Sequence, residues 1–315
     1  MMLLAQALLT GLLASLAAAA NFDQGAKGIN TGEFLQLAPG ARAAAMGEAY
    51  AAAADEASAL YWNPAALTRI KSRSATLMHA SYVADSYFDY AAGAQNLGDW
   101  GALGLGAQFF SAGPIPRTDD AGGDLGEFRP YGLALSLGYA NTFRDIELMD
   151  DLNGVSVGFS AKFVRGAILD HDNTAAFDIG LLTPEYFERL RAAFTVTNLG
   201  RGLKYEREYA PLPLAFRFGT AWKLLPGWRA TCDIVFPRHN RLYPALGTEY
   251  SWTVSPAVSL SGRAGFNAVS IGDIEGFSSV SAGVGAAFHG MSVDYAFLPL
   301  GGLGQAHRLS LTFDF

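Results

Sequence analysis

The feature that most constrains this chain is an alternation of large apolar and small residues, which recurs along most of the sequence after residue 73. In the segment 131–139, Tyr, Leu, Leu, Leu and Tyr occupy the odd positions, while Gly, Ala, Ser and Gly occupy the even positions. Successive side chains of a strand point to opposite faces of a sheet, so one face is bulky and apolar and the other is nearly bare. The same pattern occurs at 155–163, 280–288 and 291–297.

The chemistry of the two faces separates two β architectures. A soluble sandwich fills its inner face with bulky residues and places charged residues outside. Here the large apolar residues share one face and the small residues share the other, which fits lipid outside and a lumen inside. We therefore predict an all-β fold, a transmembrane antiparallel β-barrel.

The alternating segments predict about fourteen strands, an even number, as expected for a bacterial single-chain barrel. They lie at 73–82, 87–96, 101–110, 131–142, 154–165, 174–183, 192–198, 213–222, 228–235, 244–253, 257–266, 278–288, 291–298 and 306–315. If the first strand runs outward, the connections that face the exterior are long, namely 111–130, 199–212, 236–243 and 267–277. Several on the other side are tight, namely 97–100, 224–227, 255–256 and 289–290, while 144–153 and 184–191 are longer exceptions. We expect a protein integral to the bacterial outer membrane, with both termini periplasmic.

Both ends of the chain have features of targeting signals. Residues 1–20 carry no charge and end in four alanines before Asn21, which predicts a cleavable signal peptide, although Lys and Arg are absent from its start. The last strand alternates up to a terminal aromatic residue, and one face carries Leu309, Leu311, Phe313 and Phe315. A terminal Phe on such a strand resembles the signal read by the barrel-assembly machinery. The predicted partners are therefore this machinery and outer-membrane lipid.

Composition excludes other classes of protein. Half of the residues are hydrophobic, yet no stretch after the first segment approaches 18 uninterrupted apolar residues, so we exclude a helical membrane protein. The net charge of -7 leaves no basic patch with interleaved aromatics, so nucleic acid is not expected as a partner. Cys232 is the single cysteine, so no disulfide framework is possible.

Residues that could carry chemistry are sparse. The five histidines are scattered without metal-ligand spacing, and the acidic loop 119–124 lacks the spacing of a calcium-binding loop. A barrel that acts on lipids would need a lipid-facing serine and histidine on neighbouring strands, whereas the obvious serines face the lumen. We predict no enzyme activity, no metal and no cofactor.

Two stretches near the N-terminus resemble a known family. Gly40-Ala-Arg42-Ala-Ala-Ala-Met46-Gly47, followed by 54–67 with Asp55 and Asn63-Pro64-Ala65, looks like the N-terminal signature of the PorV/PorQ family. Further family-like segments occur at 196–200, 212–219, 247–250, 263–266, 293–296, 301–304 and 307–311, so the resemblance covers nearly the whole mature chain. It implies the fold of FadL-type fatty-acid transporters, a fourteen-stranded barrel with an N-terminal hatch. The motif Asn63-Pro64-Ala65 is similar to their shared hatch motif.

Physical arguments also favour a hatch. Residues 21–72 precede the first strand and include the alanine-rich stretch 41–54, which predicts a helix with Met46 and Tyr50 stacked one turn apart. The segment is too small and too polar to fold alone, and a lumen lined by small residues has room for it. The chain is thus divided into signal peptide 1–20, hatch 21–72 and barrel 73–315.

Charges of both signs are predicted to point into the lumen, where they need partners. On the strands these are Lys162, Asp178, Arg217, Asp233, Glu249, Arg263, Asp294 and Arg308. On the hatch, Arg42, Glu48, Asp55 and Glu56 are expected to pair with some of them.

Two functions of different classes remain open. The resemblance to FadL-type channels implies a barrel that passes or binds hydrophobic small molecules in a pocket between hatch and wall. The resemblance to the PorV/PorQ family also implies an alternative, an accessory or shuttle protein of a type IX secretion system, and fold alone cannot choose between them. A purely structural role is a more distant third. A large apolar cavity that reaches the exterior favours transport, whereas a closed lumen with a projecting apolar exterior loop favours partner binding.

Overall fold

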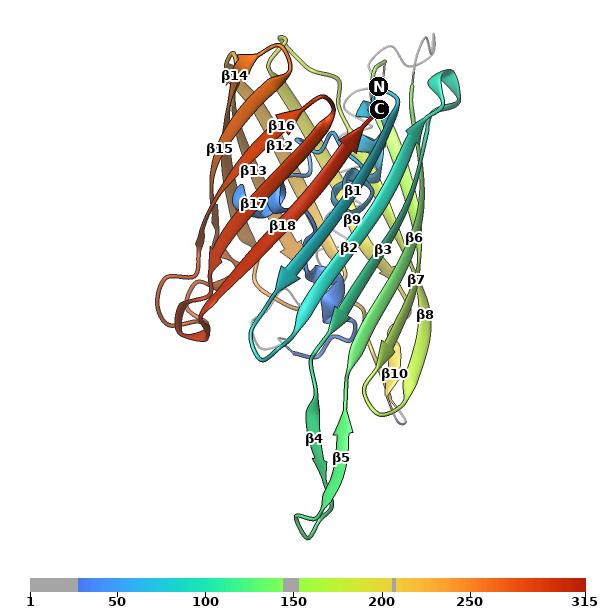
Figure 1. Cartoon of the computed structure of the whole chain (residues 1–315). Coiled ribbons are helices and arrows are strands. Elements are labelled where there is room, and N and C mark those ends of the chain that lie inside the picture. Colours follow the sequence, from blue (N-terminus) through green and yellow to red (C-terminus); the bar gives the residue numbers. More distant parts are fainter. Residues whose placement is uncertain (1–27, 144–152, 206–207) are drawn as a thin grey trace.

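The computed structural model describes residues 28–143, 153–205 and 208–315. Within these residues, fourteen antiparallel strands close a barrel in the order β1-β18-β17-β16-β15-β14-β13-β12-β9-β8-β7-β6-β3-β2 (Figure 1). The predicted fold class is therefore confirmed. The predicted signal peptide and most of the connection 144–153 lie outside the described residues.

Each barrel strand lies within three residues of its predicted position at both ends. The strands are β1 (Arg73–Ser81), β2 (Tyr87–Asn96), β3 (Ala102–Ser111), β6 (Tyr131–Thr142), β7 (Ser156–Ala167), β8 (His171–Leu182), β9 (Leu190–Gly200), β12 (Ala215–Leu225), β13 (Trp228–Pro237), β14 (Tyr243–Ser255), β15 (Val258–Asn267), β16 (Val280–Phe288), β17 (Met291–Pro299) and β18 (Gln305–Asp314).

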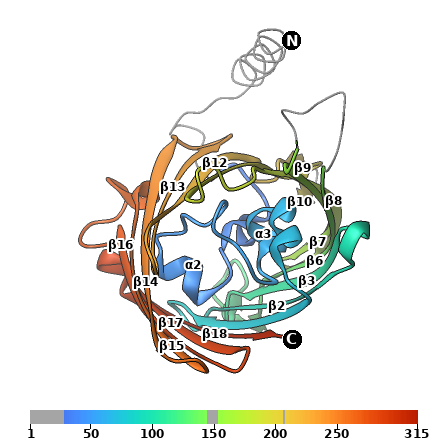
Figure 2. The same cartoon turned by 90° about the horizontal axis from the view of Figure 1, so that it is seen from above.

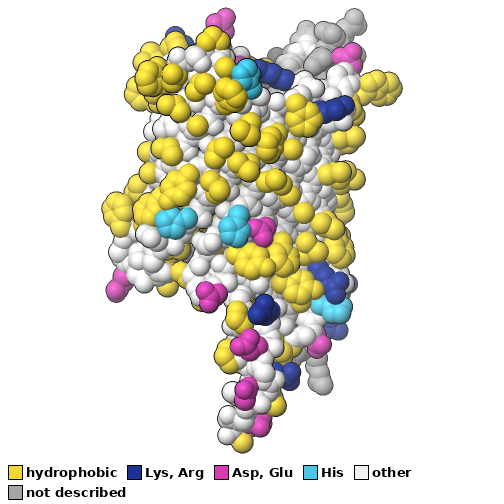
Figure 3. Space-filling model, in the orientation of Figure 1, with side chains coloured by type: hydrophobic (Ala, Val, Ile, Leu, Met, Phe, Trp, Pro, Cys, Tyr) yellow, Lys and Arg dark blue, Asp and Glu magenta, His cyan; other side chains and the backbone are white. Residues whose placement is uncertain are grey.

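The large apolar residues of the alternating segments face outward. Leu135 and Leu137 on β6 are 48% and 55% exposed, whereas Ala134, which directly precedes Leu135, is fully buried. Hydrophobic side chains cover the outer wall in Figure 3. On adjacent strands, the ring of Phe109 lies 6.0 Å from that of Tyr87 and 6.1 Å from that of Tyr131. These three rings form an aromatic belt near the ends of their strands, as in barrels that cross a bilayer.

The long connections carry structure of their own. β4 (Ile115–Thr118) pairs with β5 (Asp124–Phe128), β10 (Leu203–Tyr205) pairs with β11 (Glu208–Ala210), and η6 (Ala268–Ser270) and η7 (Gly301–Leu303) are short helical turns. The β4–β5 hairpin projects from the end of the barrel opposite to the C-terminus (Figure 1). On the other side, the connection between β2 and β3 is short and contains only η4 (Gly98–Trp100). None of the described helices is long and apolar enough to cross a membrane.

Residues 28–72 lie inside the barrel, as the view along its axis shows (Figure 2). Their regular elements are η2 (Glu33–Gln36), α2 (Ala41–Ala45), α3 (Ala59–Trp62) and η3 (Pro64–Arg69). The core of the molecule lies between these elements and the inner wall, and its largest fully buried side chains include Trp62, Tyr50 and Met46. We call residues 28–72 the hatch.

The helix predicted over 41–54 is wrong in its extent. α2 ends at Ala45, because Gly47 and Glu48 adopt left-handed backbone conformations with φ of 63° and 65°. Met46 and Tyr50 therefore do not stack along one helix. The ring of Tyr50 packs edge-on against Trp62 instead, with centroids 5.7 Å apart. The contacts between the hatch and the wall outweigh the helix propensity of the alanine residues.

Candidate functional site: the hatch and its attachment to the wall

The first attachment is a close backbone approach between Gly47 and the strands β14 and β15. A Cβ atom placed on Gly265 would lie 1.9 Å from the Gly47 nitrogen, and one on Gly247 would lie 2.5 Å from the Met46 carbonyl oxygen. Since real Cβ atoms do not approach so closely, only glycine fits at these wall positions. The bare lumen face at this point is thus a seat for the hatch backbone.

The second attachment is Asn63-Pro64-Ala65. Asn63 is fully buried, and its Oδ1 accepts a hydrogen bond from the Ala65 N–H at 3.0 Å. Its Nδ2 donates to the carbonyl oxygens of Ala51 and of Leu181 on β8, at 3.2 and 3.1 Å. Pro64 is the first residue of η3, where its fixed φ suits the turn. A Cβ on Gly180 would lie 2.1 Å from Asn63 Oδ1, so this wall position also needs glycine.

Wall side chains supply the acceptors that hatch backbone amides lack. Asp233 Oδ2 accepts from the N–H groups of Tyr50 and Ala51 at 3.1 and 3.2 Å, and Ser310 Oγ accepts from Ala41 N–H at 2.7 Å. The hatch has little regular structure, so many of its buried amides have no helical partner and need such acceptors. Ordering of the hatch is therefore coupled to its contact with the finished wall.

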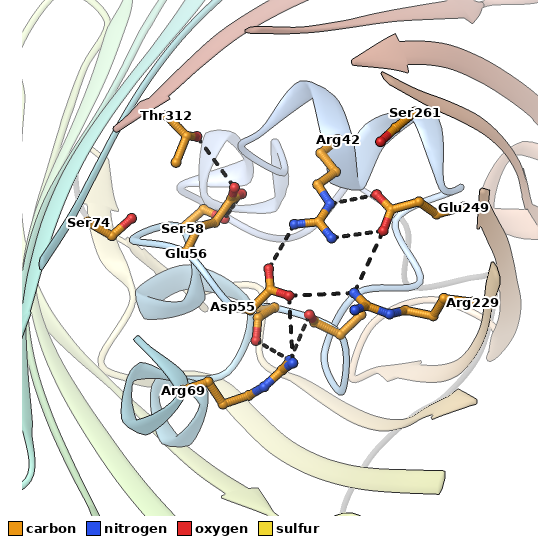
Figure 4. A network of polar contacts seen from close by, with 12 residues as sticks. Arg42, Asp55, Glu56, Ser58, Arg69, Ser74, Arg229, Glu249, Ser261 and Thr312 are labelled. Carbon is orange, nitrogen blue, oxygen red and sulfur yellow. Dashed lines mark hydrogen bonds and ion pairs between the residues drawn. The ribbon is translucent and has the colours of Figure 1, made fainter. Parts of the chain in front are cut away.

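A network of charges forms the third attachment (Figure 4). Arg42 donates from Nε and Nη2 to both carboxylate oxygens of Glu249, at 2.7 and 2.8 Å, and from Nη1 to Asp55 at 2.7 Å. Asp55 also lies 3.6 Å from Arg69 and 3.6 Å from Arg229. This network joins the hatch to β13 and β14 through a bidentate pair, the geometry that makes such ion pairs strong.

Two neighbouring carboxyl groups of the hatch have opposite pKa shifts. Burial opposes ionisation of Asp55, but Arg42, Arg69 and Arg229 outweigh it and lower the pKa of Asp55 to about 2. Burial raises the pKa of Glu56 to about 7, because Arg42 opposes this shift only in part and Asp55 and Asp294 reinforce it. Glu56 contacts hydroxyl groups instead, with Oε1 accepting from Ser58 at 2.9 Å. Asp55 thus stays charged near neutral pH while Glu56 titrates there.

All eight charges predicted to face the lumen do lie inside the barrel, and each has a partner of opposite charge. The pairs are Lys162–Asp178 at 2.7 Å, Arg217–Asp233 at 3.0 Å, Arg263–Glu249 at 2.7 Å, Arg263–Asp294 at 2.7 Å and Arg308–Glu48 at 3.3 Å. Arg69 and Arg229 were not among the charges expected in the lumen. Arg229 lies four residues before Asp233 on β13, so the alternation places both side chains on the inner face and could have identified Arg229.

The hatch motif residues are distributed over these attachments. Gly40 precedes α2 with φ of 90°, and its N–H lies 3.0 Å from Met78 Sδ. Met46 and Ala65 are fully buried. The terminal residues lie elsewhere: Leu309 on β18 and Phe315, which follows that strand, are exposed, and the backbones of Phe315 and Arg73 exchange two hydrogen bonds at 2.9 and 3.0 Å.

The two ends of the lumen differ in how they are packed. Toward the long connections, Phe34 and Leu35 pack against Leu212 and Val164. At the other end, two pockets of about 460 and 560 Å³ flank Arg42. The first is bounded by the β12–β13 turn and the second by Lys71 and Phe315, and charged residues make up much of both linings. The Arg42 network thus lies between these pockets and the apolar core.

Metal ligands are not gathered in the part of the chain that the structure describes, where no group of three or more His, Cys, Asp or Glu side chains could hold a metal ion. Cys232 is a free thiol on β13, partly exposed. The described hatch therefore offers ion pairs, hydrogen bonds and apolar contacts.

Comparison with known proteins adds a family and a fold. The sequence profile of an Uncharacterised protein family (UPF0164) matches residues 10–167. The chain belongs to UPF0164. A search of curated proteins gave no match for this UPF0164 member.

Solved structures share the fold of this UPF0164 member at low sequence identity. The P. putida toluene transporter TodX is 11% identical, with a TM-score of 0.58 over 88% of this chain and 98% of its own. The Ralstonia pickettii toluene transporter TbuX is 13% identical, with a TM-score of 0.56 over 88% and 98%. A Pseudomonas aeruginosa FadL homologue is 12% identical, with a TM-score of 0.53 over 85% and 96%. These likenesses establish a FadL-like barrel fold.

Proposed function

We propose that this chain is an integral outer-membrane barrel of the PorV/PorQ type that passes or binds hydrophobic small molecules, with the hatch as its gate. In this proposal residues 1–20 are a signal peptide, 21–72 are the hatch, 73–315 are the wall, and the terminal strand carries the assembly signal. Passage is passive and needs no chemistry in the lumen. The fold shared with two toluene transporters and a FadL homologue supports it, as does the apolar outer wall with its aromatic belt.

The manner in which the hatch is held carries the proposal. Its attachments to the wall are ion pairs, hydrogen bonds and apolar contacts, which can be exchanged without breaking the strand ladder. The hatch lies inside the barrel and packs against its inner wall, so a solute passes only when the hatch shifts. Pockets lie on two sides of the Arg42 network. The ion pairs of this network are therefore the polar contacts between hatch and wall that must break when the hatch shifts.

The test is entry of a hydrophobic fluorescent probe, N-phenylnaphthylamine, into liposomes that contain the purified protein and carry lipopolysaccharide in their outer leaflet, because plain phospholipid bilayers admit this probe without any protein. Arg42→Ala removes the link between Asp55 and Glu249, and Glu249 then keeps only its pairs with wall residues such as Arg263, so we expect faster entry. Arg238→Ala removes an exposed guanidinium and serves as the matched control. Equal entry with wild type, Arg42→Ala and empty liposomes would contradict transport.

A second candidate, an accessory or shuttle role in type IX secretion, is favoured by one observation. The hatch occupies the lumen, and the β4–β5 hairpin projects from the wall (Figure 1) with Ile115 and Leu125 exposed. An isolated two-stranded hairpin is only marginally stable, so a bound partner would stabilise it. Replacing 114–129 by a short turn should then abolish secretion in cells while leaving probe entry unchanged. Normal secretion with the shortened loop would exclude this role for the hairpin.

The proposed orientation has its own test. If the long connections face outward, trypsin added to intact cells should cut after Arg117, which lies on β4 and is followed by Thr118. The connection 144–153 should be spared. The reverse pattern would invert the barrel and contradict the assignment of periplasmic termini.

A further inference from the structure

The outer wall carries a polar cluster where apolar residues are expected. Ser81 and His79 lie on β1, Asp89 on β2 and His307 on β18, and we call these four residues the wall cluster. His79 is the register partner of Asp89, and Ser81 is the register partner of His307. Figure 3 shows histidine and acidic side chains among hydrophobic ones on the face formed by these strands. The cluster is separate from the hatch, because its side chains point away from the lumen.

Three members of the cluster have the connectivity of a catalytic triad. The Ser81 Oγ lies 3.3 Å from His79 Nε2, and His79 Nδ1 lies 2.7 Å from Asp89 Oδ1. A carboxylate that accepts from Nδ1–H holds the proton on that nitrogen, which leaves Nε2 free to accept the serine proton. Ser81 and His79 share one face because they are two residues apart on a strand, so β1 itself fixes their spacing.

His307 can supply the fourth function of such a site. Directly opposite residues of antiparallel strands have Cβ atoms about 4.5–5.5 Å apart, which places His307 beside Ser81. The Tyr295 hydroxyl lies 2.6 Å from His307 Nδ1. When that phenol donates, the neutral ring carries its proton on Nε2, which is then a donor for an oxyanion.

A groove for an acyl chain adjoins the triad. Leu77, Ala91, Phe109, Leu309 and Leu311 line a shallow depression of about 390 Å³ on the outer wall, and His79 and Asp89 border it. Apart from these two residues, its lining is dominated by apolar side chains. Phe109 also belongs to the aromatic belt, whose rings lie at the membrane interface in barrels of this kind. The cluster is therefore at the depth where ester groups of membrane amphiphiles lie.

We propose that the wall cluster hydrolyses long-chain carboxylic esters presented by the membrane. Ser81 Oγ adds to the ester carbonyl carbon while its proton moves to His79 Nε2, and Asp89 stabilises the resulting imidazolium. His307 donates to the oxyanion. The bond between the carbonyl carbon and the alcohol oxygen then breaks, and the alcohol leaves with the proton from His79. Water attacks the acyl-Ser81 ester through the same histidine, which releases a fatty acid and restores the serine.

The site is independent of the hatch function, since none of its residues contributes to the attachments described above. Ser86 provides a matched control: it lies in the turn that follows Ser81, and its hydroxyl donates to the Val83 carbonyl oxygen at 2.7 Å. Ser81→Ala and Ser86→Ala each remove one hydroxyl from the same rim of the barrel. Heat-modifiable migration on a gel reports whether each variant forms a folded barrel.

The first measurement is labelling of the purified full chain by a fluorophosphonate, a reagent that captures activated serines. We expect wild type and Ser86→Ala to be labelled at Ser81, Ser81→Ala to be unlabelled, and His79→Asn to react at least about 100-fold more slowly. Absence of label at Ser81 in the folded wild type would overturn the proposal. So would equal labelling of His79→Asn.

The second measurement identifies the source of the ester. Release of fatty acid is followed from phosphatidylethanolamine vesicles and, separately, from the same vesicles doped with a glycolipid that carries ester-linked acyl chains. Release that requires Ser81 from either preparation supports the proposal and names the source. Release from neither, or equal release by Ser81→Ala, would overturn the assigned substrate class.

Discussion

The wall and the hatch use the same small residues but are held in opposite ways. The wall is bound by backbone hydrogen bonds between strands, and its side chains only have to alternate. The longest α-helix of the hatch is α2, which has five residues. Side chains of the wall accept hydrogen bonds from several backbone N–H groups of the hatch. The difference teaches that glycine and alanine in this chain encode two things, a bare lumen face in the strands and a close-fitting backbone in the hatch.

The largest effect should come from the strand that closes the wall. β18 pairs with both β1 and β17, with Leu77 opposite Leu311 and Ala75 opposite Phe313. Removing Leu311–Phe315 deletes the closing pairs, so we expect an exported chain with no heat-modifiable folded band. Phe288→Ala, which removes another exposed aromatic, should keep that band. Normal assembly of the truncated chain would mean that the barrel closes without the last residue pairs between β18 and its two neighbouring strands.

The next largest effect should separate the hatch from an intact wall. Gly265 and Gly262 lie on the same strand, but a Cβ on Gly265 would meet the Gly47 backbone, whereas one on Gly262 would meet nothing within 4 Å. Gly265→Val should therefore displace the hatch and raise single-channel conductance in planar bilayers, while the folded band persists. Gly262→Val should behave as wild type. Loss of the folded band only in Gly265→Val would show that wall and hatch fold as one unit.

A smaller loosening is expected from the Asn63-Pro64-Ala65 turn. Asn63→Leu with Pro64→Leu removes the hydrogen bonds to Ala51 and Leu181 and the fixed φ, at about 1–3 kcal/mol for each buried group left without a partner. We expect a folded barrel with intermittently raised conductance and altered entry of hydrophobic probes. A variant that fails to assemble would assign the turn to the structural core, and unchanged conductance would remove the turn from the gate.

The smallest effect is a dependence on pH. The pKa of Glu56 in the folded protein is about 7, above its usual 4.5, so the protonated form stabilises the docked hatch. Stability from this group is present below about 4.5 and is lost as the pH rises through 7, by at most about 3 kcal/mol. Asp55 acts in the opposite sense, but only below about pH 4. Open probability should therefore be higher at pH 8 than at pH 5, and Glu56→Gln should flatten this difference.

The wall was predictable because its determinant is local. Alternation of side-chain size fixes strands and faces without knowledge of partners, so strand positions such as β2 and β6 agree with the structure at both ends. Inward charges such as Lys162 and Asp178 followed from the same phase. The partner of each charge could not be predicted from this phase, because it depends on which strands and hatch residues lie next to one another.

The hatch was not predictable in detail for the converse reason. Alanine propensity indicated one helix over 41–54, but the path of the chain is set by Gly47 meeting the wall at Gly265, some 200 residues away in sequence. The grouping of Ser81 and His79 with Asp89 was not predictable either, because it depends on the register between β1 and β2. Contacts between distant segments determine both features.

The central claim is that the hatch must move for a solute to pass, and a reversible cross-link tests it most directly. Thr68 Oγ1 on η3 lies 3.0 Å from Ser156 Oγ on β7, so cysteines at these two positions are placed to bond hatch to wall. With Cys232→Ala to prevent mispairing, we expect N-phenylnaphthylamine entry into the lipopolysaccharide-bearing liposomes to stop when Thr68→Cys/Ser156→Cys is oxidised and to return on reduction. Equal entry in the oxidised and reduced states would contradict the account.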